Sequence, residues 1–416
     1  MKKGFKYILC LFISLFLLTS VQALELDIHS TNAILYNTND DKVLYEKNEN
    51  ERVQIASLTK IMTAIVTLDK IDNLDEKVTL VSEDLKGLLE ENLVTAGFKV
   101  GQTVSYRDLL YGLLLPSGAD AAKALARSIG GTEDNFVKLM NEKAKKLNLK
   151  ETHFTNPIGL DDENNYSTVK DVSLMFEYAL KNDDFKKIVT SSSYTTSDGR
   201  LTLKNKIRHN SNVGTYLLGG KTGTTDGAGL CLASIASKDG VNFLLVTTGA
   251  PYDKKGPHNY EDAKTIYGYF ISNYSYQNIL TPSDSILTLD TKYAKRNKVD
   301  FYLDENLKLY LPNNFDKKDL NFDYSGIKTV TPFMKKGTKL GNLDIYYKSE
   351  KIKSVEITLN DKQEISILKI LDEYKLIVIG ILFLIVVLVI LRKRKKKSKK
   401  RKGKRKKTLW DLLIML

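Results

Sequence analysis

The clearest pattern along the chain is a helical spacing of apolar residues. Between Ser57 and Leu68 the apolar side chains recur at i, i+3, i+4 and i+7, which places them on one face of an amphipathic helix. The same spacing predicts helices over residues 107–115, 119–129, 133–147, 169–180 and 261–274. Thr132 and Thr168 directly precede two of these segments and are the expected N-caps.

Short β-prone runs lie on both sides of this helical middle. Residues 33–36 and 42–45 predict one hairpin, and residues 230–237 and 242–248, joined through Asp239-Gly240, predict another. From residue 279 to 359 the pattern holds short strands only, at 298–303, 308–311, 344–347 and 354–359. We therefore expect a mixed domain of helices and strands over residues 24–275, and a small β-rich domain over 276–365 that serves as a stalk.

The N-terminal end carries an apolar run of a different kind. Three lysines precede apolar residues from Tyr7 to Leu18, and a small-residue cleavage pattern follows at residues 21–23. We interpret residues 1–23 as a secretory signal peptide. The alternative, an uncleaved anchor, is disfavoured because polar residues interrupt the run after Leu18.

The C-terminal end predicts a membrane span. Residues 376–391 are sixteen uninterrupted apolar residues, and we expect a transmembrane helix over 371–391. Fourteen of the sixteen residues from 392 to 407 are Lys or Arg, so the positive-inside rule places residues 392–416 in the cytoplasm and the folded domains outside. Residues 408–416 are too short to span again; we expect them at the inner membrane surface, the alternative being a disordered end.

The charge distribution excludes nucleic acid as a partner. The chain has 63 Lys and Arg, 50 Asp and Glu and a formal net charge of +13. Fourteen of the basic residues lie in 392–407 and three in the leader, which leaves 46 basic and 49 acidic residues between Leu24 and Leu391. The folded part is therefore near neutral, without the basic excess that phosphate binding requires.

Cysteine and histidine give no sign of a metal. Cys231 is the one cysteine left after the leader, so no intrachain disulfide can form. No Cys or His cluster has metal-ligand spacing, and the four histidines, His29, His153, His209 and His258, are far apart in sequence. The sequence therefore predicts neither a metal site nor a cofactor.

Candidate chemistry begins with a Ser and a Lys three residues apart on a helix. This spacing puts both side chains on one face, where a deprotonated amine can take the hydroxyl proton. Four such pairs occur: Ser57/Lys60, Ser167/Lys170, Ser325/Lys328 and Ser366/Lys369. Ser57 opens the strongly amphipathic helix, whose apolar neighbours favour a lysine with a depressed pKa, so context selects this pair.

Two further stretches strengthen that choice. Gly219 to Thr225, which contains Lys221-Thr222-Gly223, runs directly into the second hairpin; Gly223 allows a substrate backbone to approach an edge strand, and Lys221 can hold a carboxylate or an oxyanion. Ser117 lies in a loop between two predicted helices. Taken alone, the first stretch is typical of a glycine-rich turn and the second of a capping serine.

The three stretches, in this order, resemble the penicillin-recognising serine enzymes, whose motifs are S-x-x-K, S-D-N and K-T-G. The closer similarity is to the D-alanyl-D-alanine carboxypeptidases, the low-molecular-mass penicillin-binding proteins. Residues 43–46, 56–64, 155–160 and 166–168 also resemble that family. The resemblance covers roughly residues 25–275, and it implies an α/β (α+β) sandwich like that of serine β-lactamases and DD-peptidases, with helices on both sides of an antiparallel sheet.

The resemblance also implies a role for each matching residue. Ser57 would be the acylated nucleophile, Lys60 its base and Ser117 a proton relay. The substrate-binding residues would be Lys221, Thr222, Gly223 and Thr225, the backbone N–H groups of Ser57 and Thr225 forming the oxyanion hole.

The chain departs from the family pattern at two positions. Ala119 stands where the second motif usually has Asn, and Ile158 stands where a loop motif usually has His. Both departures remove side-chain hydrogen bonds, which puts the rate and the deacylation step in question.

The function implied is that of a membrane-anchored, extracytoplasmic serine carboxypeptidase. It would remove the terminal D-Ala from peptidoglycan stem pentapeptides through a Ser57 acyl-enzyme and bind β-lactam antibiotics covalently. Two alternatives stay open at this point. A β-lactamase-like hydrolase would carry the same motifs, and Ala119 leaves room for a non-catalytic scaffold that binds the cell wall.

Overall fold

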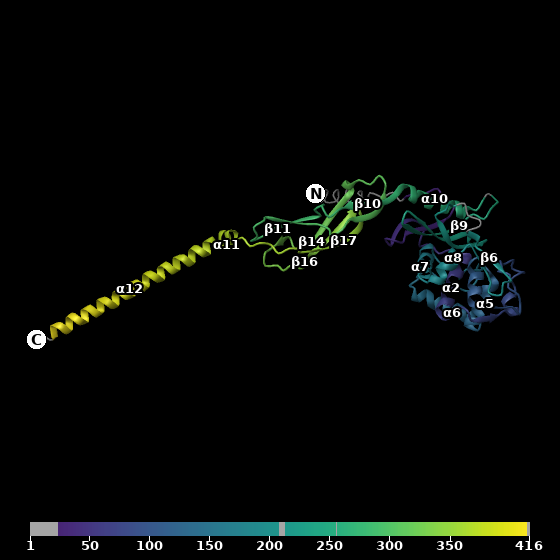
Figure 1. Ribbon diagram of the computed structural model, residues 1–416, viewed down its shortest axis with the longest axis horizontal. Helices are drawn as coiled ribbons and strands as arrows, with labels where there is room; N and C mark the ends of the chain where they lie inside the picture. Colours follow the sequence, from purple (N-terminus) through teal and green to yellow (C-terminus); the bar gives the residue numbers. More distant parts are fainter. Residues whose placement is uncertain (1–23, 208–212, 255, 414–416) are drawn as a thin grey trace, which may run out of the picture. The chain divides into compact units, whose positions relative to one another are not determined.

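The computed structural model describes residues 24–207, 213–254 and 256–413 (Figure 1). The predicted signal peptide lies outside the described residues. Contacts divide the chain into two compact units, with the boundary between Ser272 and Asn273. We call these the first unit and the second unit.

The first unit is built on a five-stranded antiparallel sheet in the order β2-β1-β9-β8-β7. Its strands are β1 (Asn32–Asn37), β2 (Lys42–Lys47), β7 (Leu217–Thr225), β8 (Gly229–Lys238) and β9 (Val241–Ala250). The two hairpins predicted from the sequence are β1–β2 and β8–β9. The glycine-rich stretch is strand rather than turn, and it forms the edge of the sheet as β7.

Helices cover both faces of this sheet, and the alternation of β8 shows how. Cys231, Ala233 and Ile235 belong to the large core shared with the helical middle. Ser234 points to the opposite face, where its Oγ lies 3.0 Å from the hydroxyl of Tyr267 in α10. Because successive strand residues face opposite ways, one strand contributes to both layers. The expected sandwich, an antiparallel sheet between helices, is confirmed.

The helices begin where the sequence provides N-caps. The side chains of Thr132 and Thr168 accept hydrogen bonds from Asn135 N and Asp171 N, at 3.2 Å and 3.0 Å, as predicted. The helical elements of the first unit are η1 (Ala56–Leu58), α2 (Thr59–Lys70), α3 (Ser82–Leu85), α4 (Tyr106–Leu114), α5 (Ala119–Gly130), α6 (Glu133–Lys146), α7 (Val169–Leu180), α8 (Asp183–Thr190) and α10 (His258–Asn273). The unit also holds two small two-stranded sheets, β3 (Lys77–Thr79) with β4 (Thr103–Ser105) and β5 (Ser193–Thr195) with β6 (Thr202–Lys204).

The second unit is all-β up to its last two helices. Its strands are β10 (Tyr274–Leu280), β11 (Leu287–Thr291), β12 (Lys298–Phe301), β13 (Leu307–Pro312), β14 (Leu320–Gly326), β15 (Thr329–Val330), β16 (Lys339–Tyr347) and β17 (Glu350–Thr358), with a short η2 (Lys317–Asp319). They form three small sheets, β10-β13, β12-β11-β15 and β14-β16-β17, around a separate hydrophobic core. All four strands predicted here are present.

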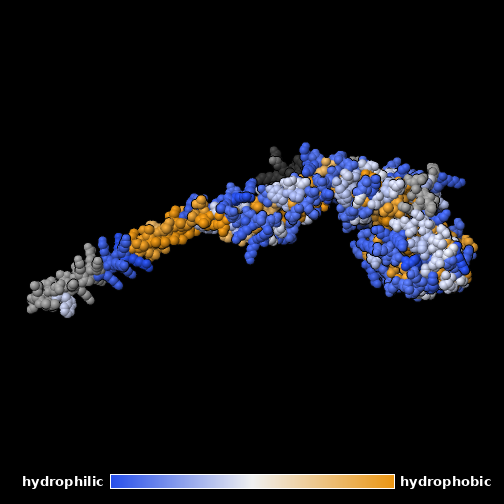
Figure 2. Space-filling view, viewed as in Figure 1, coloured by the Kyte–Doolittle hydropathy of each residue, from blue (hydrophilic) through white to orange (hydrophobic). Residues whose placement is uncertain are grey.

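The chain ends in α11 (Ile367–Glu373) and the long α12 (Lys375–Leu413). The stretch Lys375–Lys399 has a mean hydropathy of 2.9 in its most apolar window, none of it buried, and is long and apolar enough to cross a membrane. Figure 2 shows this apolar stretch giving way to hydrophilic residues farther along the helix. Residues 408–413 continue the same helix instead of forming a separate segment.

Candidate active site

The nucleophile predicted from the sequence lies at the junction of η1 and α2. Ser57 is the middle residue of η1, and Lys60 is in the first turn of α2. Ile61, Met62 and Ile65 bury the apolar face of α2 in the core, which fixes the helix and therefore the Ser–Lys face. Lys60 Nζ lies 2.9 Å from Ser57 Oγ, so the predicted pair is in hydrogen-bonding contact.

Lys60 is held in an environment that disfavours its charge. Its side chain is almost completely buried, with 2% of the residue exposed, and its other hydrogen bond is to the carbonyl oxygen of Ile158 at 2.6 Å. Burial, assisted by the positive charge of Lys206 and opposed by Asp120, lowers the pKa of Lys60 to about 7. A substantial part of the lysine is therefore an uncharged amine at neutral pH.

The Ile158 carbonyl is fixed by an asparagine. Asn156 Oδ1 accepts hydrogen bonds from the backbone N–H groups of Ile158, Gly159 and Leu160 at 3.2, 2.7 and 3.0 Å. Gly159 has φ +87°, and a Cβ there would lie 1.9 Å from Ala56 O, directly before Ser57. Ile158 therefore contributes a backbone acceptor to Lys60, although its side chain cannot replace the histidine usual in the family.

A second serine–lysine pair faces the site from two other elements. Lys221 Nζ, from β7, donates to Ser117 Oγ at 2.8 Å and to Thr222 O at 2.6 Å. Ser117 has φ +72°, a strained conformation for a residue with a side chain. Burial, with the nearby charges of Lys60 and Lys206, lowers the pKa of Lys221 well below its usual range.

Asp120, in the first turn of α5, holds the loop of residues 96–98 that precedes β4. Its carboxylate accepts hydrogen bonds from Ala96 N, Gly97 N and Phe98 N at 2.8, 3.0 and 3.0 Å. The side chain is therefore directed at this loop, as expected from its place in the first turn of the helix. Ala119, at the start of α5, is buried and donates its N–H to Val94 O at 2.8 Å.

Strand β7 passes very close to the nucleophile. A Cβ on Gly223 would lie 2.9 Å from both Ala56 Cβ and Ser57 N, so only glycine fits there. Thr225 ends the strand, and its side chain accepts a hydrogen bond from Ala228 N at 3.1 Å. Since β7 is an edge strand, its outer edge can accept an extended peptide as a further strand.

Sequence reasoning missed Lys206. This residue follows the short strand β6, and its backbone N–H donates to Leu115 O at 3.4 Å, close to the Ser117 loop. Burial lowers the pKa of Lys206. When Lys206 is charged, its positive charge lowers the pKa values of Lys60 and Lys221. It carries no motif spacing, so the sequence held no signal for it.

The competing serine–lysine pairs have other roles. Ser366 caps α11, while Lys369 Nζ donates to Ala294 O at 2.6 Å and to Asn297 Oδ1 at 2.7 Å. Ser167 is fully buried and shares a hydrogen bond of 2.8 Å with Thr152. Both observations favour the choice of Ser57 made from context.

Comparison with known proteins gives a consistent family. A family model described as D-alanyl-D-alanine carboxypeptidase matches residues 19–252, and one for the C-terminal domain of penicillin-binding protein 5 matches residues 274–365. D-alanyl-D-alanine carboxypeptidase DacF of Bacillus subtilis (strain 168) is 30% identical over 328 residues, 77% of this chain and 82% of the relative. DacC of Escherichia coli (strain K12) is 29% identical over 342 residues, 80% and 83% of the two chains.

Solved structures agree with these sequence matches. The DD-transpeptidase of Streptomyces K15 aligns with a TM-score of 0.54 at 32% identity, covering 60% of this chain and 98% of its own. Penicillin-binding protein 5 from Haemophilus influenzae aligns with a TM-score of 0.61 at 25% identity, covering 82% of this chain and all of its own. With more than half of the chain matched by one family model and the expected sandwich in place, this protein belongs to the D-alanyl-D-alanine carboxypeptidase family of serine-type hydrolases.

Proposed function

We propose that this protein removes the terminal D-Ala from peptidoglycan stem pentapeptides through a covalent acyl-enzyme on Ser57. The observation that carries the proposal is the contact of 2.9 Å between Ser57 Oγ and Lys60 Nζ. The lysine is buried, and its hydrogen bonds are to uncharged oxygens. An amine with a pKa of about 7 can be uncharged at neutral pH and accept the hydroxyl proton.

Acylation then follows from the positions of the neighbouring groups. Lys60 takes the proton of Ser57 as Oγ attacks the carbonyl carbon of the penultimate D-Ala. The carbonyl oxygen, which becomes negative, would accept hydrogen bonds from the backbone N–H groups of Ser57 and Thr225. The close approach of β7 to Ser57, which requires Gly223, would bring these two donors to the same side of the substrate.

The leaving group needs a proton, and the second pair can supply it. Ser117 Oγ, which is hydrogen-bonded to Lys221 Nζ at 2.8 Å, would relay to the departing D-Ala amine the proton that Lys60 took from Ser57, which leaves Lys60 uncharged again. Lys221 Nζ would also donate a hydrogen bond to the C-terminal carboxylate of the peptide. Hydrolysis of the ester by water, with Lys60 as the base, would complete the cycle.

The same site would bind β-lactam antibiotics covalently. A β-lactam presents a strained amide carbonyl beside a carboxylate, as the peptide does, so Ser57 would open the ring and retain the drug as an ester. A labelling experiment tests this: a fluorescent penicillin is added to the full-length protein, and the modified residue is located by mass spectrometry. We expect a stable adduct on Ser57 that is absent from Ser57→Ala.

The same experiment distinguishes the alternatives. An adduct on Ser167 or Ser325, or no adduct on a folded protein, would contradict the assignment; absence of label is the result expected of a scaffold that only binds the cell wall. Rapid release of hydrolysed drug is the result expected of a β-lactamase. Ser167→Ala is the matched control and should label like the wild type.

We also propose that the enzyme is exported by a cleaved signal peptide and held by a single C-terminal span, with residues 24–365 outside and the basic tail inside. The apolar stretch of α12 and the fourteen basic residues after it support this orientation. Protease added to intact cells should remove the folded units and leave a C-terminal tag protected. Digestion of the tag from outside would overturn this topology.

A further inference from the structure

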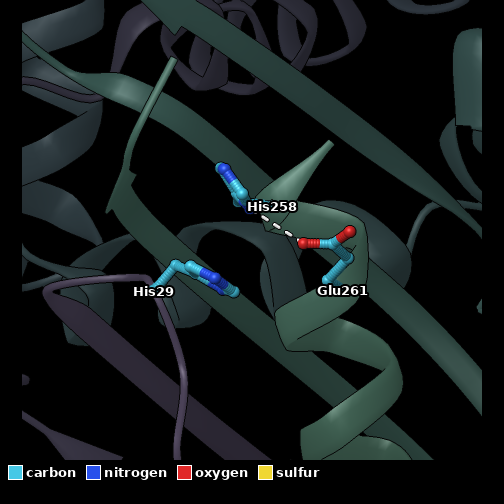
Figure 3. A group of neighbouring side chains, drawn as sticks. All are labelled: His29, His258 and Glu261. Atoms are coloured by element: carbon cyan, nitrogen blue, oxygen red, sulfur yellow. Dashed lines mark hydrogen bonds and ion pairs between the residues drawn. The ribbon is translucent and has the colours of Figure 1, made fainter. Parts of the chain in front are cut away.

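Two histidines that are far apart in the sequence of the first unit lie together at the start of α10. The rings of His29 and His258 stack with centroids 4.2 Å apart and planes inclined by 25°. Glu261, one turn farther along α10, points toward them (Figure 3), and one ligand atom from each of the three residues lies within 4.8 Å of the other two. None of these residues takes part in the proposed catalytic site.

His29 is oriented by a buried carboxylate. Its Nδ1 lies 3.0 Å from Asp262 Oδ1, and Asp262 is itself fixed by the backbone N–H groups of His29 and Ser30 at 2.8 and 2.7 Å and by the Ser30 hydroxyl at 2.5 Å. Donation from Nδ1 leaves the lone pair on Nε2. A histidine held by a carboxylate through one nitrogen is the usual arrangement of a metal-binding histidine.

His258 is nearly buried and has a carboxylate at each ring nitrogen. Nδ1 lies 2.8 Å from Glu261 and Nε2 lies 3.0 Å from Asp253. Together with Asp262, three carboxylates surround two imidazoles, so the cluster favours a positive charge. That charge can be the proton of an imidazolium or a metal ion that takes its place.

The donor set indicates which metal. Imidazole nitrogen with carboxylate oxygen suits zinc and similar divalent transition ions better than magnesium or calcium, which prefer oxygen alone. Three atoms within 4.8 Å of one another have a common centre no more than about 2.8 Å from each, against zinc bonds of about 2.0–2.2 Å. The distances therefore require each ligand atom to move by less than about 1 Å, and the stacked rings must turn so that both lone pairs point at the ion.

We propose that His29, His258 and Glu261 bind a zinc ion, with Asp262 orienting His29 and Asp253 orienting His258 through its other ring nitrogen. Such an ion would join the segment that enters β1 to the first turn of α10, two pieces of chain that are far apart in sequence. Its role is structural, so it does not depend on the function proposed for Ser57.

The test is a cobalt titration of the full-length protein in detergent, after treatment with a chelator, followed by visible absorption and by competition with zinc. We expect one saturating equivalent in the wild type, and binding at least tenfold weaker in His29→Gln and Glu261→Gln. His153→Gln is the matched control, because His153 is an exposed histidine bonded to a backbone carbonyl, Asn164 O. It should bind like the wild type.

A second measurement guards against misfolded variants. Zinc should raise the melting temperature of the wild type and of His153→Gln, and should not raise that of His29→Gln, because binding stabilises the state that holds the site. All variants should still be labelled by penicillin, which separates this proposal from that for Ser57. Absence of saturable uptake by the wild type, or equal uptake by His29→Gln, would show that the cluster holds only a proton and overturn the proposal.

Discussion

The two active-site lysines of the first unit and three surface lysines of the second unit are held by different kinds of partner. In the first unit Lys60 and Lys221 are buried and donate to uncharged oxygens, those of Ser57, Ile158, Ser117 and Thr222. In the second unit three lysines lie at the surface beside carboxylates: Lys292 with Glu373 at 2.6 Å, Lys339 with Glu356 at 2.5 Å, and Lys351 with Asp344 at 2.7 Å.

This difference sets the direction of each pKa shift. Burial lowers the pKa values of Lys60 and Lys221, whereas the hydrogen bond to Glu373 raises the pKa of Lys292 and that to Asp344 raises the pKa of Lys351. A lysine can act as a base near neutral pH where burial removes the water that stabilises its charge and no carboxylate replaces that water. The lysines of the surface pairs stay protonated and have no lone pair with which to act as a base.

The largest effect should come from removing the base. Lys60→Met keeps the length of the side chain in its buried site but leaves Ser57 without a proton acceptor, so acylation by a β-lactam should fall by about 10²–10⁴-fold. Second-order acylation rates measured with a fluorescent penicillin test this. Circular dichroism should show an unchanged fold.

The matched control is Lys170→Met, which alters the lysine of the competing pair with Ser167. Lys170 is exposed, and its substitution should leave the acylation rate unchanged. Equal losses in the two variants would show that the contrast between buried and exposed lysines does not explain reactivity.

The next effect concerns Ala119, which lacks the side-chain amide that the family usually has at this position. Asp120 is committed to the backbone of residues 96–98, and Ala119 offers no polar atom, so the site lacks the amide usual in the family. Ala119→Asn should raise the acylation rate by roughly tenfold to several hundredfold, since one hydrogen bond that strengthens in the transition state contributes about 1–4 kcal/mol. An equal or lower rate would mean that the pocket is already built around alanine.

The pH dependence of acylation should follow the uncharged form of Lys60. With a pKa of about 7, the rate should be nearly independent of pH well above 7 and should fall about tenfold for each unit below it. The sign follows from the chemistry, because protonation removes the lone pair that accepts the proton of Ser57. A rate that rises as the pH falls would contradict the assignment of Lys60 as base.

Lys206→Met sharpens this test. The charge of Lys206 lowers the pKa of Lys60, so its removal should move the acidic limb of the profile to higher pH while the plateau rate changes less. A purely structural residue would lower the rate at every pH without moving the limb. The measurement is the acylation rate between pH 5 and pH 9.

The parts of the site predictable from sequence are those that local geometry or a motif specifies. Ser57 and Lys60 share a helix face, so spacing and amphipathicity were sufficient to select them. Ser117 and Lys221 are 104 positions apart; the family resemblance placed both in the site, and their direct contact was not predicted. Lys206 and the pair of His29 with His258 have no spacing signal, because tertiary folding alone brings them to their partners. The separation of His29 and His258 in sequence therefore gave no indication that the two rings stack.

The same reasoning explains what was missed in the fold. The individual helices and hairpins followed from periodic and alternating apolar residues, which carry their signal within about ten residues, whereas their arrangement as a sandwich was implied by the family resemblance. Helix α8 spans eight residues and β15 only two, too short for periodicity to show. In the second unit β14 was missed because most of its residues are exposed, so alternation between a core face and a solvent face is weak.

The smallest effect should come from the surface pairs of the second unit. Lys351 and Asp344 form an ion pair, and Asp344 also accepts a hydrogen bond from Ser354 Oγ at 2.6 Å, so the carboxylate keeps a partner and access to water after Lys351→Met. Exposed pairs gain little because water screens both charges and holding two side chains costs entropy. We expect no resolvable change in the urea midpoint of the full chain or in its acylation rate. A clear loss of either would show that lysine–carboxylate pairs in the second unit contribute to stability or to reactivity. The contrast with the buried lysines of the first unit would then be wrong.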